Sequence, residues 1–280
     1  MDTFDARLCK SIAPAASVQG LTFASKINYA AEISLVKQKT LLTYYLFSVK
    51  ISRYNFLAEL ITMKENKKLM TVTAHTGCEG TADNSLEAIK KGYASGADIV
   101  EFDLRFTESG EPVLSHDADG KNCVTLKEAF ELVAQCENLK VNVDCKTVEN
   151  IAIVPKIAEE CGVNGRFFYT GIEAEKVEAV QKNSPGTQYY LNTKVSKLRK
   201  NSEKYIGSLV KLIKDNDAVG INIRFTTASK KMVEIFHKEG LMVSVWTVNK
   251  EKDMHKVLPL GCDNITTRQP TKLIEIINSK

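Results

Sequence analysis

Glu101 and Asp103 are carboxylates that stand one residue apart within an apolar run. In a β-strand alternate side chains point to the same face, so these two carboxylates would share one face. Two like charges on an inward face are costly unless a positive group joins them. A divalent metal ion with oxygen ligands is the simplest such group, and we predict one here. A pair of salt bridges to lysines or arginines is the alternative.

Asp144 and Lys146 repeat this spacing in a second apolar run. Asp144 can supply a third carboxylate to the metal ion. Lys146 can contact a phosphate oxygen or neutralise the acidic site. An internal ion pair between the two residues, without any ligand, is the alternative.

Two of the four histidines each end a short apolar run. His75 follows Thr-Val-Thr-Ala, and His116 follows Pro-Val-Leu-Ser. Unperturbed histidine titrates near neutral pH, so two imidazoles at one site suit the roles of general base and general acid. A structural hydrogen bond is the alternative for either one alone. His237 and His255 lie in predicted helices near lysines, and we interpret them as surface residues.

Three further residues are candidates for substrate contact. Trp246 is the only tryptophan and lies in a predicted strand. It either packs in the core or forms an apolar wall for a substrate. Arg268 and Lys272 follow the last predicted strand and can attract an anion, although we interpret them as solvated charges.

The elements that must position these residues follow from periodicity. From Thr71 onward, short apolar runs alternate with longer amphipathic runs, which indicates βα units and a parallel sheet. The predicted strands are 71–75, 98–104, 112–116, 139–144, 166–170, 187–191, 218–223, 241–247 and 262–266. The predicted helices are 85–95, 126–135, 148–161, 173–182, 202–215, 228–238 and 250–258, and Asn84 with Glu87 is a capping arrangement for the first of them.

This pattern predicts a (β/α)8 TIM barrel, with one strand more than the barrel wall needs. An open doubly wound sheet is the alternative, but no glycine-rich dinucleotide turn follows the first strand. Residues 104–111 carry no helical pattern, and an extended chain of this length can return to the bottom of the barrel. Asp103 and His116 would then both lie at the C-terminal face, where barrel enzymes have their active sites.

Residues 1–68 lack this alternation, so we predict an N-terminal extension before a barrel over 69–280. We favour a packing helix or a loosely ordered extension. An amphipathic helix that contacts a membrane surface through residues 37–53 is an alternative. The polar leader before the first strand suggests a further hypothesis, that translation starts at Met63 and residues 1–62 are not made. The intact mass of the native protein tests it.

Composition disfavours several other classes of protein. A net charge of +4 over 280 residues does not indicate a nucleic-acid-binding protein. No apolar run reaches the roughly 18 residues of a transmembrane helix, and the first ten residues make a poor signal peptide. The seven cysteines include no C-x-x-C pair, which disfavours a zinc site, and their odd number in a long chain disfavours a disulfide framework. We therefore expect reduced thiols in a cytoplasmic protein.

Taken together, these residues resemble the glycerophosphodiester phosphodiesterase family. The matching stretches, in chain order, are 74–77, 83–88, 96–103, 107–117, 143–146 and 246–249. The resemblance implies a (β/α)8 barrel that binds Mg²⁺ or Ca²⁺ and cleaves a small phosphodiester into an alcohol and a phosphomonoester. By position, His75 and His116 match the acid–base pair. Glu101, Asp103 and Asp144 match the metal ligands, and Lys146 matches a phosphate-contacting lysine. We assign Lys146 and Trp246 to substrate binding.

Four features depart from the family pattern. Thr76 stands where the family usually has an arginine, which removes a bidentate phosphate clamp. Asp144 replaces a glutamate, and Asp83-Asn84-Ser85 replaces Glu-Asn-Thr. The usual insertion after His-Asp is missing, so we expect a more open pocket. The alternatives are a barrel that binds phosphate without turnover, or a lyase that yields a cyclic phosphate.

Overall fold

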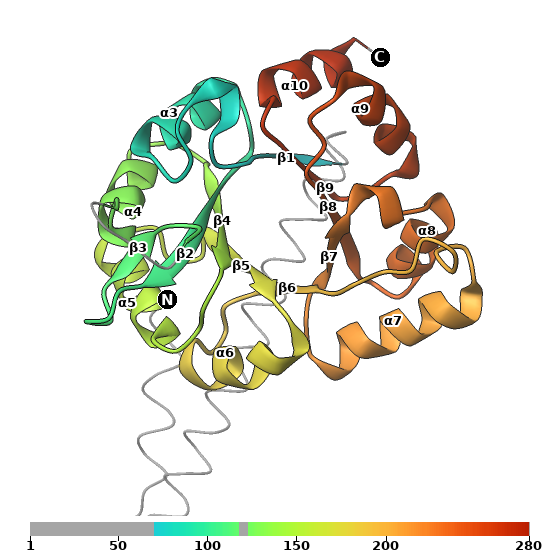
Figure 1. Ribbon diagram of the computed structural model, residues 1–280, viewed down its shortest axis with the longest axis horizontal. Helices are drawn as coiled ribbons and strands as arrows, with labels where there is room; N and C mark the ends of the chain where they lie inside the picture. The colour runs from blue at the N-terminus through green and yellow to red at the C-terminus, as the bar shows by residue number, and fades with distance from the viewer. Residues whose placement is uncertain (1–69, 118–122, 280) are drawn as a thin grey trace, which may run out of the picture. The chain divides into compact units, whose positions relative to one another are not determined.

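Eight parallel strands close into a barrel in the computed structural model, which describes residues 70–117 and 123–279 (Figure 1). Each strand pairs with the next around the ring, and β1 pairs with both β2 and β9, which closes it. The barrel strands are β1 (Thr71–Ala74), β2 (Ile99–Phe106), β4 (Lys140–Cys145), β5 (Phe167–Ile172), β6 (Tyr189–Asn192), β7 (Gly220–Arg224), β8 (Met242–Trp246) and β9 (Asn264–Thr267). The predicted (β/α)8 barrel is therefore confirmed, and each predicted strand boundary is displaced by at most two residues.

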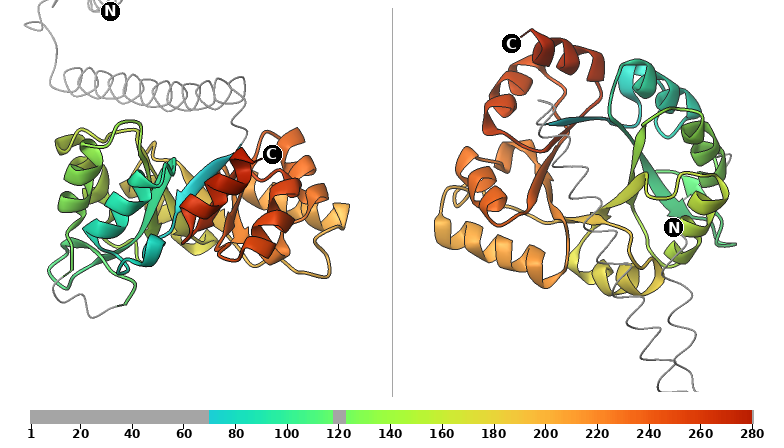
Figure 2. Two further views of the ribbon diagram at one scale, coloured as in Figure 1. Left: turned by 90° about the horizontal axis from the view of Figure 1, so that it is seen from above. Right: turned by 180° about the vertical axis from the view of Figure 1, so that it is seen from behind.

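One α-helix follows each barrel strand on the outside, with the hairpin strand β3 (Pro112–Leu114) lying between β2 and its helix (Figures 1 and 2). The helices are α3 (Leu86–Ala94), α4 (Leu126–Ala134), α5 (Val154–Glu160), α6 (Val177–Asn183), α7 (Glu203–Asp215), α8 (Lys230–Lys238), α9 (Glu251–Val257) and α10 (Pro270–Asn278). All but α10 were predicted. Proline at the first position of α10 is compatible with a helix start, and Leu273 and Ile276 bury its inner face.

The additional strand is β3, which pairs antiparallel with β2. The prediction that residues 104–111 return to the bottom of the barrel was wrong. Instead, β2 continues past the rim to Phe106, and a tight turn sends β3 back along it. In this turn Gly110 has a φ of 86°, and its N–H donates to the carbonyl of Thr107. His116 still reaches the rim, because β3 descends toward the level of Asp103, where the Ser115 N–H donates to the Asp103 carbonyl.

Period-two alternation in the strands separates the core from the site. In β2, Phe102 and Leu104 are buried against the helices, and the Phe102 ring lies 6.3 Å from that of Phe130 on α4. Glu101 and Asp103 therefore face the barrel interior, as predicted.

The barrel interior changes in character along its axis. Ile99, Phe168 and Tyr190 form a separate apolar cluster near the N-terminal ends of their strands. Above them lie hydrogen-bonded polar side chains, such as Thr170, whose hydroxyl donates to the side-chain oxygen Oδ1 of Asn142 at 2.8 Å. This polar layer separates the charged side chains at the C-terminal mouth from the apolar cluster. The charges therefore avoid the free-energy cost of lying against an apolar core.

The N-terminal predictions fall on residues outside the described ranges. These are the extension over 1–68, the membrane-contacting helix within 37–53 and the start at Met63. Within the described ranges, no helix combines the length and the apolar composition needed to cross a bilayer.

Candidate active site

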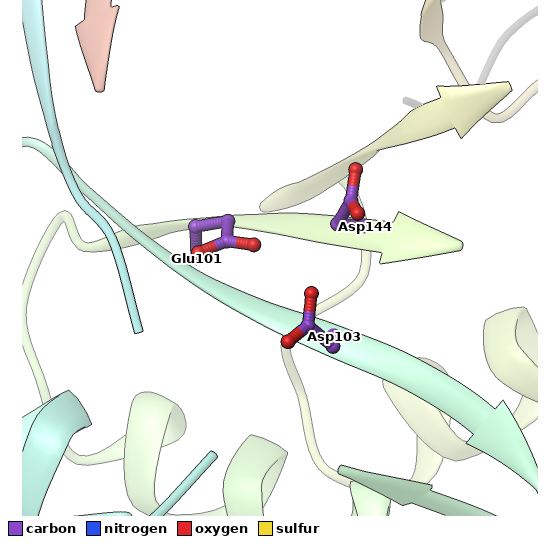
Figure 3. A group of neighbouring side chains, drawn as sticks. All are labelled: Glu101, Asp103 and Asp144. Atoms are coloured by element: carbon purple, nitrogen blue, oxygen red, sulfur yellow. The ribbon is translucent and has the colours of Figure 1, made fainter. Parts of the chain in front are cut away.

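Three carboxylates gather at the C-terminal mouth of the barrel (Figure 3). Glu101 and Asp103 project from β2 and Asp144 from the adjacent β4, where Asp103 and Asp144 are register partners. One oxygen from each lies within 4.8 Å of the others. Glu101 and Asp103 are buried, at 6% and 3% exposure. The predicted cluster therefore forms, and its donors are the hard oxygens that Mg²⁺ and Ca²⁺ prefer.

Burial makes the charged form of Glu101 unfavourable. It raises the pKa of Glu101 to about 7, and the charges of Asp103 and Asp144 add to the effect. The nearby His75 opposes the rise, as does the Thr76 N–H, which donates to Glu101 Oε2 at 2.9 Å. A bound cation would offset the same cost, so the pKa of this group is sensitive to occupancy of the site.

Lys146 lies between two of the carboxylates. Its Nζ is 2.7 Å from Asp103 Oδ1 and 2.5 Å from Asp144 Oδ2. Burial opposes its charge, but the two carboxylates outweigh that cost and raise the pKa of Lys146. The ion pair considered for Asp144 and Lys146 is therefore present, and it includes Asp103 as well. Three carboxylates and one ammonium group leave a formal charge of −2 in the cluster.

His75 lies at the end of β1 beside this cluster. Its Nδ1 is 2.8 Å from the Thr76 carbonyl oxygen and 3.7 Å from Glu101 Oε2. Because a carbonyl oxygen only accepts, Nδ1 carries the hydrogen, and Nε2 of the neutral ring keeps its lone pair. This tautomer suits His75 to accept a proton.

His116 follows β3 and lines the same cavity as His75. Its Nδ1 lies 2.9 Å from Asp117 Oδ1, and its carbonyl oxygen accepts from Arg105 Nε at 2.8 Å. A carboxylate accepts the hydrogen of Nδ1 and forms an ion pair with the ring when it is protonated. Asp117 therefore suits His116 to carry and give a proton.

Asn84 is a site residue that the sequence analysis missed. Its Nδ2 donates to Asp103 Oδ2 at 2.9 Å, and its Oδ1 accepts from the Asp103 N–H at 2.9 Å. The predicted capping role of Asn84 was wrong, because Ser85 caps α3 by accepting from the Ala88 N–H. Asn84 has a φ of 55°, which directs it away from the helix and into the site. The sequence did hold a signal for this role. Asn84 and Ser85 are adjacent and either residue type can cap a helix, so one of them was left for another function.

Thr76 is buried at 2% exposure. Its hydroxyl accepts from the Asn84 N–H at 2.5 Å. Thr76 therefore connects the β1 loop to Asn84, and it does not present a polar group to the cavity. The position where the resemblance implied an arginine thus holds a buried threonine that is hydrogen-bonded to Asn84.

Arg268 follows β9 and lines the cavity, so its interpretation as a solvated charge was incomplete. Its Nη1 lies 2.9 Å from Asp83 Oδ1, and its Nη2 donates to Asp83 Oδ2 at 3.0 Å. Lys272 is not among the residues that line the cavity and pairs with Glu251 at 3.6 Å. The position of Arg268 directly after the last barrel strand was the signal for its place in the site, because the C-terminal ends of all barrel strands meet at the mouth.

The cavity has a volume of about 580 Å³ and is lined by all seven predicted site residues, among others. These are His75, Glu101, Asp103, His116, Asp144, Lys146 and Trp246. Trp246 is half-buried at the end of β8, with its Nε1 buried and without a hydrogen-bond partner. The Arg224 guanidinium lies over its ring, 5.5 Å from the centroid. Trp246 thus forms part of the cavity wall.

Comparison with known proteins places this geometry in context. The model of the glycerophosphoryl diester phosphodiesterase family matches residues 67–142 and 135–272. A glycerophosphodiester phosphodiesterase of Caldanaerobacter subterraneus subsp. tengcongensis is 24% identical in an alignment of 250 positions that covers 74% of this chain and 97% of that protein. One from Bacillus altitudinis is 23% identical and covers 73% of this chain and 97% of its own.

Solved structures share the fold. A putative glycerophosphodiester phosphodiesterase from Galdieria sulphuraria superimposes with a TM-score of 0.62 at 22% identity, over 75% of this chain and 98% of that one. An Oleispira antarctica phosphodiesterase, solved in complex with the product sn-glycerol-3-phosphate, gives 0.60 at 19% identity, over 74% and 96%.

Proposed function

Because the chain belongs to the glycerophosphoryl diester phosphodiesterase family, and is thus a phosphoric diester hydrolase, we propose that it hydrolyses glycerophosphodiester-like substrates to an alcohol and a phosphomonoester, with Mg²⁺ or Ca²⁺ as cofactor. The observation that carries this proposal is one cavity whose lining includes the three carboxylates of the acidic cluster and two histidines. The substrate we propose is a small molecule, and the cavity volume of about 580 Å³ is suited to one.

The residues of the acidic cluster fit a divalent cation. Glu101, Asp103 and Asp144 offer three oxygens within 4.8 Å of one another. With Lys146 included, the formal charge of −2 is the charge that such an ion balances. A divalent cation held there would stabilise negative charge on the phosphoryl oxygens of the substrate.

His75 is the proposed general base. Its hydrogen on Nδ1 leaves Nε2 free to take the proton of an attacking water. The water oxygen then bonds to phosphorus, and the bond from phosphorus to the alcohol oxygen breaks. Glu101, 3.7 Å from Nδ1, stabilises the imidazolium that results.

His116 is the proposed general acid. It gives a proton to the departing alcohol oxygen, so the alcohol leaves neutral, and Asp117 holds the ring by its Nδ1. Lys146 and Arg268 are the lysine and arginine side chains of the cavity lining, and both suit contact with an anionic diester. Trp246 offers an apolar wall to the carbon skeleton of the substrate.

Hydrolysis by the full chain of glycerophosphocholine, glycerophosphoethanolamine and bis-p-nitrophenyl phosphate tests the proposal. We expect turnover with Mg²⁺ or Ca²⁺ and its loss in EDTA. His75→Ala and His116→Ala should each lower kcat by about 10²- to 10⁴-fold. His237→Ala is the matched control, because His237 pairs with Asp263 away from the cavity lining. Undiminished turnover by His116→Ala would rule out its assigned role.

The product distinguishes hydrolysis from the lyase alternative. Attack by water yields a phosphomonoester at once, whereas attack by a neighbouring substrate hydroxyl yields a cyclic phosphate. We expect ³¹P NMR during turnover to show the phosphomonoester alone. A cyclic phosphate that persists would replace hydrolysis by the lyase reaction.

We also propose a cytoplasmic location. Cys78, Cys136, Cys145 and Cys262 are buried free thiols, and Cys161 is a half-buried free thiol. Reduced thiols are typical of a reducing compartment. Cell fractionation with an antibody to the native protein tests the location, and its recovery in a secreted fraction would contradict it.

A further inference from the structure

A second cavity of about 280 Å³ adjoins the first at the mouth of the barrel. Four residues line both cavities, namely Glu173, Asn192, Asn222 and Trp246. Glu173 follows β5, Asn192 and Trp246 end β6 and β8, and Asn222 lies within β7, whereas the acidic cluster projects from β2 and β4. A ligand that reaches from the acidic cluster across Trp246 therefore enters the second cavity.

The two cavities differ in charge. The lining of the first holds five carboxylates against the cations Lys146 and Arg268. The lining of the second adds Lys194 and Arg224, and its one carboxylate is Glu173. Neither of these added cations has an ion-pair partner within the described ranges, and both are exposed. The second cavity is thus the basic side of an otherwise acidic mouth.

Two polar atoms on the shared wall lack partners. The Asn222 side chain is 94% buried, and its Oδ1 accepts no hydrogen bond, while Trp246 Nε1 donates none. Both atoms are themselves covered, so a ligand meets instead the polar side chains of Asn192 and Thr193 in the cavity lining. An amide and a hydroxyl both donate and accept hydrogen bonds, which suits a hydroxylated substituent such as a polyol.

Arg224 is held in place for such a ligand. Its guanidinium lies 5.5 Å above the Trp246 ring, so the aromatic face that a cationic headgroup would occupy already bears a cation. A positively charged substituent would meet Arg224 and Lys194 with like charge. A substituent with a negative charge would meet two unpaired cations instead.

We propose that the second cavity binds the alcohol substituent of the diester and favours one that carries an additional anionic group, such as a phosphorylated polyol. The inference rests on the proposed function, because it concerns the part of the substrate that leaves. It assigns Lys194 and Arg224 as residues that determine substrate preference.

The test compares three diesters with the full chain: glycerophosphoglycerol, the same diester phosphorylated on its far glycerol, and glycerophosphocholine. We expect the phosphorylated diester to have a kcat/KM about fivefold above the neutral one, mainly through KM, since exposed ion pairs are weak. Glycerophosphocholine should be the poorest substrate. The preference should fade in about 1 M salt, where the Debye length is about 3 Å.

Variants locate the preference. Lys194→Gln and Arg224→Gln should each lower the ratio of phosphorylated to neutral kcat/KM, and Lys194→Glu should lower it further. Lys197→Gln is the control, because this exposed lysine on the same loop lines neither cavity, and its ratio should equal that of the parent.

Each outcome is decisive. Equal kcat/KM for the neutral and phosphorylated diesters overturns the inference and leaves the proposed function intact, provided that the neutral diester is hydrolysed. A preference that survives in both glutamine variants overturns the assignment to this cavity. If the parent hydrolyses none of the three with metal, the proposed function fails and the inference fails with it.

Discussion

At the scale of single residues, the neutral Asn84 is hydrogen-bonded to the acidic cluster. Asn84 fixes Asp103 from both sides, through its side-chain oxygen and nitrogen, and its own N–H is bound to Thr76. Hydrogen bonds of this kind orient a ligand carboxylate and tune its basicity. The acidic cluster therefore depends on a neutral residue that no charge count reveals.

Asn84→Ala should weaken divalent-metal affinity by about 10- to 100-fold, because Asp103 loses both hydrogen bonds to Asn84 and its carboxylate, within the described ranges, is then held only by Lys146. Titration calorimetry with Mg²⁺ and Ca²⁺ measures it. The neighbouring Ser85→Ala is the control. It removes the cap of α3 and should cost about 1 kcal/mol of unfolding free energy while metal affinity stays unchanged. Equal metal affinity in both variants would contradict the role of Asn84.

The raised pKa of Glu101 predicts how the free energy of unfolding depends on pH. Its folded pKa of about 7 lies above the unfolded value, so folding favours the protonated carboxyl. The stabilisation that the protonated Glu101 contributes is fully present below about pH 4.5 and is lost as pH rises through about 7. In EDTA we expect a loss of roughly 3 kcal/mol over this range, reduced by saturating metal.

Urea denaturation at several pH values measures this effect. Glu101→Gln cannot ionise, so the variant in EDTA should lose less stability over the same pH range than the parent. If parent and variant change equally with pH, another group is responsible.

At the scale of elements, β5 carries an irregularity that shapes the site. Its pairing with β6 shifts between Tyr169 and Ile172, and Gly171 within it has a φ of 70°. A Cβ at Gly171 would lie 2.7 Å from the Cys145 carbonyl oxygen and 3.0 Å from Asp144 Oδ1. The absence of a side chain there is what lets Asp144 occupy its place.

Gly171→Ala should therefore destabilise the protein by about 1–3 kcal/mol and also weaken metal binding, because Asp144 must move. Gly186→Ala is the matched control. It has a φ of 81° but no atom within 4 Å of its Cβ, so it should cost about 1 kcal/mol and leave metal binding unchanged. Thermal unfolding and calorimetry on both variants measure the two effects. Unchanged metal affinity in Gly171→Ala would contradict the argument.

The sequence predicted the features that follow from the periodicity of apolar residues. It predicted less well the features that depend on contacts between residues distant in the sequence. Alternation in β2 placed Glu101 and Asp103 inward, because apolar neighbours had to meet the helices. The direction of β3 was missed, since a strand after a short connection pairs either way and the turn at Gly110 decided it. Asn84 and Arg268 gain their roles from partners distant in sequence, Asp103 and Asp83, which spacing does not reveal.

At the scale of the whole molecule, we propose that residues 69–280 form an independent unit. The described barrel begins at Thr71, and the family match begins at residue 67. Residues 69–280 expressed alone should unfold in one cooperative transition and match the metal-dependent kcat/KM of the full chain. Circular dichroism and the diesterase assay measure this. Loss of folding would show that the preceding residues belong to the unit. The intact mass of the native protein tests separately whether translation starts at Met63.

The closure of the ring between β1 and β9 has a consequence during synthesis. β1 is the first barrel strand to leave the ribosome, and its partner β9 ends only at Thr267, near the end of the chain. Until then β1 and β8 both expose unpaired backbone edges, which are templates for association with other chains. Contacts of such long sequence separation also form slowly. A chain that stalls before β9 is thus an open sheet prone to aggregation, and the barrel loses its exposed edges only once β9 has paired with β1 and β8.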